Sequence, residues 1–482
     1  MNTCLPKARL VNAFCSKSTL LLVTLTFTIA AMVFVLPRHR VAYAASGDWP
    51  TYLSDNGRSG YNPAETIINP GSAPHLKMHW SYKAGSFIST QPVEANGLIY
   101  WGSWDGYEHA TQLNGTQVWQ QSLGYTFSKN CNSQTGVAST ATIASVMIGG
   151  KMTSVDFVGG GDAHFWALNA STGAVIWRTQ LGTSPAHFIW SSPAVYNGNV
   201  YIGVASFGDC PLIRGKLIEL NASTGAINHT FYTLPRGCIG AGVWGSPAID
   251  MADTAVYFAT GNANACSKSE PYSIAVVKLN ATSLSHIDSW QVPTNQQTSD
   301  GDFGSTPTLF QASIGGKMHN LVGVANKNGV YYAFDRTNLH QGPVWQAKIA
   351  DSIGGGCGPT CGQGSISPSS WDGTTLFVAG GNTVIHGNSC MGGLRALNPS
   401  NGSFEWEDCM NGGPVVGAVT EVPGVVVVGE GNKFVLAATS DGHTLFSYTD
   451  TNNGSHFYGA ASISNGVLYI GNMDDTFYAF GT

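Results

Sequence analysis

The stretch Ala167-Leu168-Asn169-Ala170-Ser171-Thr172-Gly173, followed by Trp177, decides the fold of this chain. The pattern returns in Ala396-Leu397-Asn398-Pro399-Ser400-Asn401-Gly402 and Trp406, and in both copies ten positions separate the alanine from the tryptophan. Asn followed by Gly is typical of a turn between antiparallel strands, and the terminal tryptophan is large enough to pack one sheet against the next. The pattern therefore predicts an all-β repeat.

Looser copies extend this repeat along the chain. They run from Ala110 to Trp119, Lys278 to Trp290, Ala333 to Trp345 and Ala437 to Phe446. In the copy that begins at Glu219, His229 occupies the tryptophan position, and we interpret it as a substituted docking residue. Repeats of roughly 40–60 residues with several strands each predict a β-propeller.

The two ends of the repeat region predict the number of blades. The strand-like segment Tyr478-Ala479-Phe480 has no tryptophan strand after it, whereas Leu76–Tyr82 contains Trp80 and has no repeat before it. Joining the two halves makes one blade and assigns Trp80 to the last repeat. We therefore predict an eight-bladed β-propeller over residues 76–482, closed by pairing of the N- and C-terminal strands, with residues 45–75 as an N-terminal wrapping segment.

The first 44 residues differ from the rest. Three basic residues precede an apolar run from Thr19 to Leu36, and Ala42-Tyr43-Ala44 offers a cleavage site between small residues. This pattern predicts a secretory signal peptide, with an uncleaved membrane anchor as the alternative. Its removal takes away five basic and no acidic residues, so the formal charge moves from −6 to −11. That balance argues against nucleic acid as a partner.

The eight cysteines that follow the predicted signal favour disulfides in an exported chain. Local pairs are expected between Cys357 and Cys361 and between Cys390 and Cys409. Free or metal-bound thiols are the alternative. The sequence contains no Cys-x-x-Cys-His, and therefore no motif for covalent haem attachment.

Four blocks between Gly240 and Arg336 carry residue types that suit a flat, anionic cofactor with a metal. They supply an aromatic ring (Trp244), an amide oxygen (Asn262), a carboxylate (Asp302) and a cation (Lys327). Each has a structural alternative: a packing tryptophan, a turn asparagine, a turn-capping aspartate with Asp300 as competitor, and a solvated lysine. A hard dication takes oxygen ligands, and a cofactor with several carboxylates needs cations around it.

The repeat resembles that of the quinoprotein alcohol dehydrogenases, eight-bladed propellers that use pyrroloquinoline quinone (PQQ). The opening Asp48-Trp49-Pro50 … Tyr61-Asn62-Pro63 is also similar to the start of that family. The segment from Ser192-Pro193 to Ser206 is closest to the polyvinyl-alcohol dehydrogenase-like branch. The resemblance covers nearly all of the chain after the predicted signal.

The resemblance implies a role for each residue of the set. Trp244 would stack on the quinone, Asn262, Asp209 and Asp302 would hold calcium, Asp302 would be the catalytic base, and Lys327 would contact the quinone oxygens. The substrate would be a small-molecule or polymeric alcohol. Electrons would pass to a separate acceptor such as a cytochrome, in the periplasm, outside the cell or at the cell surface.

The chain also departs from the family pattern. Asp209 stands near the position of the family's metal-binding Glu, Gly242 replaces a donor two residues before Trp244, and no two cysteines are adjacent. The same repeat also occurs in non-catalytic assembly-factor propellers. A binding or assembly scaffold that has lost the cofactor is therefore the second hypothesis.

Overall fold

The computed structural model describes residues 47–264, 266–352, 358–452 and 454–482. The chain divides into Met1–His39 and Arg40–Thr482, and all described residues belong to the second unit. The predicted signal peptide lies outside the described residues. Within the part that is described, no helix is long and apolar enough to cross a membrane.

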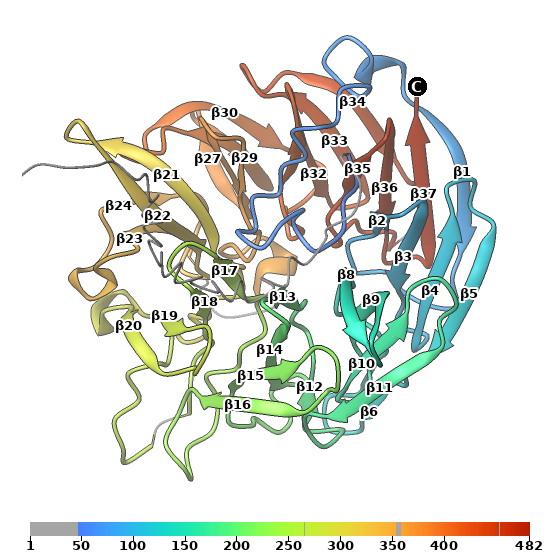
Figure 1. The fold of residues 1–482 in the computed structure, drawn as a ribbon. Helices are drawn as coiled ribbons and strands as arrows, with labels where there is room; N and C mark the ends of the chain where they lie inside the picture. Colours follow the sequence, from blue (N-terminus) through green and yellow to red (C-terminus); the bar gives the residue numbers. More distant parts are fainter. Residues whose placement is uncertain (1–46, 265, 353–357, 453) are drawn as a thin grey trace, which may run out of the picture. The chain divides into compact units, whose positions relative to one another are not determined.

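Eight four-stranded antiparallel sheets form a ring, which confirms the predicted eight-bladed propeller (Figure 1). The strands of each blade are given from first to last. Blade 1 is β2–β5 (Val93–Ala95, Leu98–Gly102, Tyr107–Gln112, Gln117–Ser122), and blade 2 is β8–β11 (Thr142–Ile148, Lys151–Gly159, His164–Asn169, Val175–Gln180). Blade 3 is β13–β16 (Ala194–Tyr196, Asn199–Ser206, Lys216–Asn221, Ile227–Tyr232), and blade 4 is β17–β20 (Ala248–Asp250, Ala255–Ala259, Ala275–Asn280, His286–Gln291). Blades 5 to 7 are β21–β24 (Thr308–Ile314, Lys317–Ala325, Val330–Asp335, Trp345–Lys348), β25, β26, β29 and β30 (Ser370–Trp371, Leu376–Gly380, Gly392–Leu397, Phe404–Met410) and β31–β34 (Thr420–Val422, Val425–Glu430, Lys433–Ala438, Thr444–Thr449).

Blade 8 joins the two ends of the described chain, as predicted. It contains β35 (Ser462–Ser464), β36 (Val467–Gly471), β37 (Thr476–Gly481) and, outermost, β1 (Lys77–Lys83). Strand β1 runs antiparallel to β37, from Lys77 opposite Gly481 to Lys83 opposite Thr476. This pairing leaves no open edge between the first and last blades.

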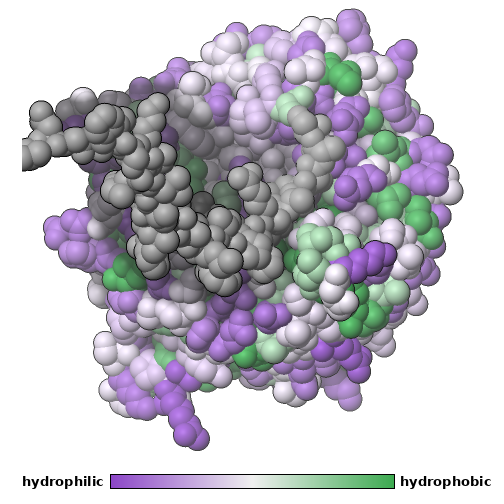
Figure 2. Space-filling view, viewed as in Figure 1, coloured by the Kyte–Doolittle hydropathy of each residue, from purple (hydrophilic) through white to green (hydrophobic). Residues whose placement is uncertain are grey.

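In the described part of the chain, one extra strand, two hairpins and several 3₁₀ turns lie outside the eight blades. Strand β12 (His187–Phe188) pairs with β14, and two hairpins are formed by β6 and β7 (Thr126–Ser128, Ser133–Thr135) and by β27 and β28 (Thr383–Ile385, Asn388–Cys390). The 3₁₀ turns are η1 (Ala73–His75), η2 (Thr294–Gln296), η3 (Leu339–Gln341) and η4 (Gly358–Cys361). In the view of Figure 2, hydrophobic side chains form small scattered patches among hydrophilic ones. Among the described residues visible in this view, no single large apolar face is seen.

The Trp and Gly of the repeat meet across neighbouring blades. In five blades the indole N–H of the outermost strand donates to a carbonyl in the turn between the last two strands of the next blade, over 2.8–3.0 Å; the pairs are Trp80–Leu113, Trp119–Ala170, Trp177–Ala222, Trp345–Pro399 and Trp406–Thr439. The glycine of the same turn lies under the indole ring. A Cβ added at Gly173 or Gly402 would lie 2.7 or 2.4 Å from a ring atom of Trp119 or Trp345. The repeat therefore conserves a docking contact that needs both a large ring and a missing side chain.

The copy with His229 breaks this contact on both sides. His229 Nδ1 forms a 2.7 Å hydrogen bond with Glu219 of its own blade. The facing turn of blade 4 carries Leu284, at positive φ, where the turns that receive a tryptophan have glycine. The carbonyl of Ala281, which corresponds to the docking acceptor, receives the hydroxyl of Tyr201 from blade 3. A buried tyrosine hydroxyl thus satisfies the acceptor that an indole satisfies elsewhere.

A chain of hydrogen bonds links the first strands of adjacent blades around the axis. Each bond runs from a backbone N–H of one blade to a side-chain hydroxyl of the next blade, over 2.8–3.0 Å. The pairs, donor first, are Gln91–Thr140, Thr140–Ser192, Ser192–Ser246 and Ser246–Thr306. All five residues are buried. In blades 2 to 5, the Ser or Thr before the inner strand therefore satisfies a backbone donor of the preceding blade.

The N-terminal segment hydrogen-bonds to the innermost strand of every blade. Its residues 49–62 contact Glu94, Ile143, Val195, Ile249, Leu309, Trp371, Glu421 and Ile463 in ring order. Arg58 is fully buried and donates to the carbonyls of Pro247, Pro193 and Tyr52. The segment thus covers the central axis at the end where the first and second strands of each blade are joined.

Candidate functional site

The predicted site residues lie in loops at one end of the propeller, which we call the site face. Asp209 follows β14, Asn262 follows β18 and Lys327 follows β22, each between the second and third strands of a blade. Trp244 and Asp302 lie in the connections from β16 to β17 and from β20 to β21. In an antiparallel blade these two kinds of loop open at the same end, opposite the docking turns and the N-terminal segment. The topology therefore brings residues from three blades to one face.

Four of the predicted residues line one cavity of about 250 Å³. Its walls are formed by Trp190, Ala205, Ser206, Phe207, Gly208, Asp209, Leu212, Gly242, Trp244, Gly261, Asn262 and Asp302. Lys327 is absent from this lining. The four predicted residues therefore present two carboxylates, one amide and one indole to the same space.

Asp302 is buried and held from two directions. Its Oδ1 accepts the backbone N–H of Asn262 at 2.5 Å, and its Oδ2 lies 2.8 Å from Nζ of Lys327. Burial raises the pKa of Asp302, although Lys327 and the hydrogen bond from Asn262 oppose that rise. Asp300 is more exposed than Asp302 and does not line the cavity, so the geometry favours Asp302 over its competitor.

Lys327 lies behind Asp302. Its Nζ is 2.8 Å from both Asp300 Oδ1 and Asp302 Oδ2, and 5.3 Å from the ring centre of Trp244. Burial disfavours its ammonium form, but the two carboxylates outweigh burial and raise the pKa of Lys327. The lysine is therefore a fixed positive charge paired with Asp302, and the solvated-lysine alternative does not describe it.

Asp209 faces the same space from blade 3. Burial raises the pKa of its carboxyl, the negative charge of Asp302 raises it further, and Lys327 lowers it. Among the described residues, none donates a hydrogen bond to this carboxylate. The two carboxylates thus line the same cavity, and in the described part of the chain Lys327 pairs with Asp302 but not with Asp209.

Trp244 forms a flat wall between two cavities. A Cβ added at Gly304 would lie 2.0 Å from its ring, so one part of the indole rests on this glycine. On the other side of Trp244 and Trp190, a second cavity of about 360 Å³ follows the central axis and is lined by Tyr52, Trp104 and Tyr458 among others. Burial raises the pKa of Tyr52 to about 12 despite the nearby charge of Arg58. Trp244 is therefore a cavity residue and takes no part in docking one blade on the next.

Sequence reasoning missed Trp190, which lines both cavities. Its indole donates to the Ser206 carbonyl at 3.1 Å and its ring lies against Phe207. A signal was present: Trp190 precedes Ser192-Pro193 by two positions, as Trp244 precedes Ser246-Pro247. Equivalent positions in consecutive blades project to the same part of the axis.

The residues present fit a dication and a flat group. Asp209, Asp302 and Asn262 offer oxygen ligands of the kind that calcium prefers. A cation would also neutralise Asp209, which has no ion pair among the described residues, whereas Asp302 is paired with Lys327. Gly242 and Gly261 leave the wall beside Trp244 free of side chains. A Cβ at Gly261 would lie 2.7 Å from Asp302 Oδ1, and one at Gly242 would lie 2.9 Å from Ala205 Cβ.

Three described disulfides tie loops of the site face together. They join Cys131 to Cys210, Cys238 to Cys266 and Cys390 to Cys409. The Cys390–Cys409 prediction is confirmed, and the alternative of free or metal-bound thiols is wrong for these six residues. The predicted Cys357–Cys361 pair lies outside the described residues because Cys357 is not among them.

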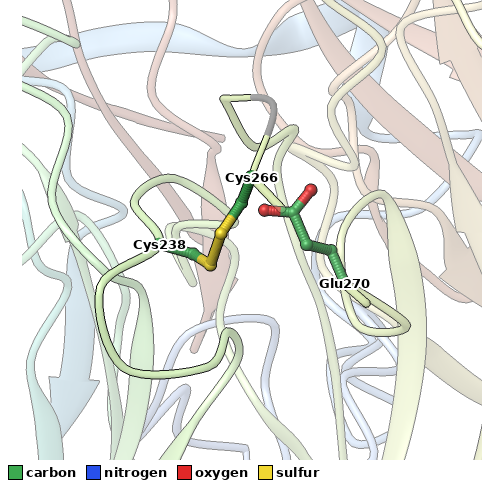
Figure 3. Close-up of side chains that lie close together, drawn as sticks. All are labelled: Cys238, Cys266 and Glu270. Carbon is green, nitrogen blue, oxygen red and sulfur yellow. A yellow bond between two sulfur atoms is a disulfide. The ribbon is translucent and has the colours of Figure 1, made fainter. Parts of the chain in front are cut away.

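Cys238, Cys266 and Glu270 lie close together, but they do not form a metal site (Figure 3). The two sulfur atoms are bonded to each other and therefore offer no thiolate. Backbone hydrogen bonds from Ala241 to Asn262 and from Asn264 to Ile239 join the same two loops. The cluster therefore helps to position the segment that carries Asn262.

Comparison with known proteins supports this reading of the fold. A sequence model of the PQQ_2 family, described as "Outer membrane protein assembly factor BamB", matches residues 109–360, more than half of the chain. The chain belongs to this family of PQQ-repeat propellers. The resemblance to the quinoprotein dehydrogenase-like propellers is confirmed at this level.

The relatives of this PQQ-repeat propeller include dehydrogenases. The quinohemoprotein alcohol dehydrogenase of Comamonas testosteroni is 24% identical over 342 residues, which cover 62% of this chain and 46% of that protein. A polyvinylalcohol dehydrogenase of a Pseudomonas species is 22% identical over 451 residues, 82% of this chain and 66% of that protein. The chain spans about half the length of the first of these relatives.

Solved structures of two kinds share the fold. The crystal structure of the Comamonas testosteroni enzyme has a TM-score of 0.71 at 18% identity and covers 91% of this chain and 81% of that one. BamB from Moraxella catarrhalis has a TM-score of 0.55 at 14% identity and covers 84% of this chain and 98% of that one. The PQQ-repeat propeller is thus similar both to a dehydrogenase and to an assembly factor, and the site must separate these functions.

Proposed function

We propose that this protein is an exported PQQ- and calcium-dependent alcohol dehydrogenase that passes electrons to a separate acceptor. One observation carries the proposal: Asp209, Asn262 and Asp302, from loops of neighbouring blades, converge on one cavity walled by Trp244. The repeat itself requires none of these side chains for blade docking. The dehydrogenase relatives support the same reaction class.

Asp302 is positioned to act as the general base. Asn262 N–H and Lys327 Nζ bind its two oxygens, which fixes the orientation of the carboxylate at the cavity wall. It would accept the proton of the substrate hydroxyl while the hydrogen on the carbinol carbon leaves with an electron pair. A bound quinone would supply the two-electron acceptor for the hydrogen and its electron pair, so that loss of the hydroxyl proton to Asp302 would leave a carbonyl compound.

The remaining side chains bind and orient. Trp244 supplies a flat surface for stacking, and Asp209, Asn262 and Asp302 would hold calcium through oxygen. Lys327 keeps positive charge beside Asp302 and the indole, and we assign it the contact with the quinone oxygens. The alcohol would be a small molecule or a polymer, and the external acceptor would be a cytochrome.

A non-catalytic scaffold is the second function, and two observations favour it. The matching family model is described by an assembly factor, and the ammonium of Lys327 already pairs with two carboxylates instead of facing the cavity. In such a protein the loops of the site face would bind another protein.

Reconstitution of the purified protein with PQQ and calcium separates the two functions. We expect a shift of the quinone absorbance and alcohol-dependent dye reduction, both measured against protein without calcium. Asp302→Asn should abolish dye reduction. Asp300→Asn is the matched control, because Asp300 also pairs with Lys327 but does not line the cavity. Failure of the wild type to bind PQQ at micromolar concentration would exclude the dehydrogenase.

A further inference from the structure

Asp209 is held in a segment with few other attachments. The segment from Gly208 to Leu212 turns at Asp209, whose φ is +60°. Within the described chain, one conventional hydrogen bond reaches it from outside, a long one of 3.4 Å from Ser128 Oγ to the Cys210 carbonyl. The loop is therefore weakly attached by hydrogen bonds, although it carries an acidic group of the cavity.

A covalent link lies directly beside this aspartate. Cys210 follows Asp209 and is bonded to Cys131, 79 residues earlier in the chain. Cys131 lies at the tip of the β6–β7 hairpin, which is inserted between blades 1 and 2. A Cβ at Gly208, a residue of the cavity wall, would lie 3.3 Å from the Cys131 sulfur. The hairpin thus reaches the rim of the cavity and fastens the loop of blade 3 there.

The negative charges around the cavity explain why the Asp209 loop needs the Cys131–Cys210 disulfide. Asp209 lines the same cavity as Asp302, and the negative charge of Asp302 disfavours an ionised Asp209, although Lys327 offsets part of this effect. A loop free to move would relieve the remaining repulsion by carrying Asp209 away. The Asn262 loop differs, since the Cys238–Cys266 disulfide is reinforced there by backbone hydrogen bonds from Ala241 and Asn264. Of these two loops, the Asp209 loop is the one whose described attachments to its neighbour are a disulfide and one long hydrogen bond from Ser128.

We propose that the Cys131–Cys210 disulfide is a positioning element that keeps Asp209 against Asp302 and Asn262, so that the cavity can bind a divalent or trivalent cation. This inference rests on the proposed function, because it takes the three residues as the cation site. The hairpin and its disulfide act only through Asp209 and do not touch the cation. Loss of such a supporting contact lowers metal affinity by about 10–100-fold in known metal sites.

Cation binding by the full-length protein tests the proposal without any turnover. Terbium binding is followed by luminescence sensitised by the nearby tryptophans, with calcium as competitor and no quinone present. The double variant Cys131→Ser/Cys210→Ser should bind terbium about tenfold or more weakly than the wild type. Cys238→Ser/Cys266→Ser is the control at the same cavity and Cys390→Ser/Cys409→Ser the remote one, and both should stay within about threefold of the wild type.

Asp209→Asn distinguishes positioning from a general loss of structure. If the disulfide acts through Asp209, this substitution weakens terbium binding in the wild type but adds little in the Cys131→Ser/Cys210→Ser protein. If the Cys131→Ser/Cys210→Ser variant does not fold, the folded wild type is reduced and alkylated instead, and its affinity for terbium should fall. Reoxidation of a reduced sample that was not alkylated should restore that affinity.

Three results would overturn the inference. They are unchanged affinity after loss of the Cys131–Cys210 bond, additive losses with Asp209→Asn, and equal losses in the two control variants. If the wild type binds neither terbium nor calcium, the proposed cation-dependent dehydrogenase fails as well. If the wild type binds terbium and calcium, and all three cysteine double variants bind terbium with the same affinity, only the positioning role of the Cys131–Cys210 disulfide is wrong.

Discussion

The contact between tryptophan and glycine across blades can be tested at Gly225, which lies under Trp177. The residue has a φ of +72°, and an added Cβ would lie 2.5 Å from Cε3 of Trp177 and 2.8 Å from Oγ1 of Thr179. The indole cannot move freely, because its N–H donates to the Ala222 carbonyl at 3.0 Å. Gly225→Ala should therefore displace the ring and weaken the interface between blades 2 and 3.

Two effects add in the expected loss of stability. An L-residue at positive φ costs about 1 kcal/mol, and overpacking against the ring costs about 1–3 kcal/mol more. Gly198→Ala is the matched control in the same blade. Gly198 has a φ of +77°, but an added Cβ would have no atom within 4 Å, so only the first cost of about 1 kcal/mol applies. The free energy of unfolding should thus fall by about 2–4 kcal/mol for Gly225→Ala.

Urea denaturation followed by tryptophan fluorescence and circular dichroism measures both variants. Replacing Trp177 by Leu in each background completes a cycle, and the excess cost of Gly225→Ala over Gly198→Ala should shrink when the indole is gone. Equal losses for the two glycine variants would refute the docking argument. So would an excess that persists in the Trp177→Leu background.

Three further predictions concern other buried groups. Arg58→Lys should lower the free energy of unfolding by about 2–4 kcal/mol in urea denaturation, because one ammonium cannot replace the guanidinium bonds to several carbonyls. Ser246→Ala should cost about 1–3 kcal/mol by leaving the buried N–H of Ser192 without an acceptor, and Ser246→Thr should retain most of that stability. Asp156 and Glu108 are buried carboxyl groups that interact, and burial raises the pKa of both, so the folded protein binds more protons than the unfolded chain above about pH 4, and stability should fall as pH rises above that value. Asp156→Asn should flatten the pH dependence of the thermal midpoint, and an unchanged slope would contradict the assignment.

The sequence predicted the parts of the fold that rest on local pattern. The turn glycine and the tryptophan repeat because five docking contacts use the same two shapes, so their spacing predicted eight blades and the closing role of Trp80. Where the pattern failed at His229, the sequence could not show that Tyr201 takes over the acceptor. That replacement comes from a different strand and depends on the packing between blades.

Long-range attachments were beyond sequence reasoning. The segment around Arg58 binds all eight inner strands largely through backbone groups, which carry no residue signature. The Cys131–Cys210 bond joins residues 79 positions apart, and only the fold shows that a hairpin of one blade reaches the loop of another. In the candidate site, residue type and order singled out Trp244, Asn262 and Asp302, which the fold places around one cavity, but the pairing of Lys327 with Asp302 required the geometry.

Docking and the candidate site use opposite ends of the same strands. The turns that receive the tryptophans join the third and fourth strands, whereas Asp209, Asn262 and Lys327 follow second strands at the other end. Each blade is thus secured to the next without using its site-face loops. Those loops are then free to carry charged residues, insertions and disulfides that a docking turn could not accommodate. It follows that a substitution such as Gly225→Ala should change stability while leaving the cavity intact, and that Asp302→Asn should alter the cavity while leaving the ring closed.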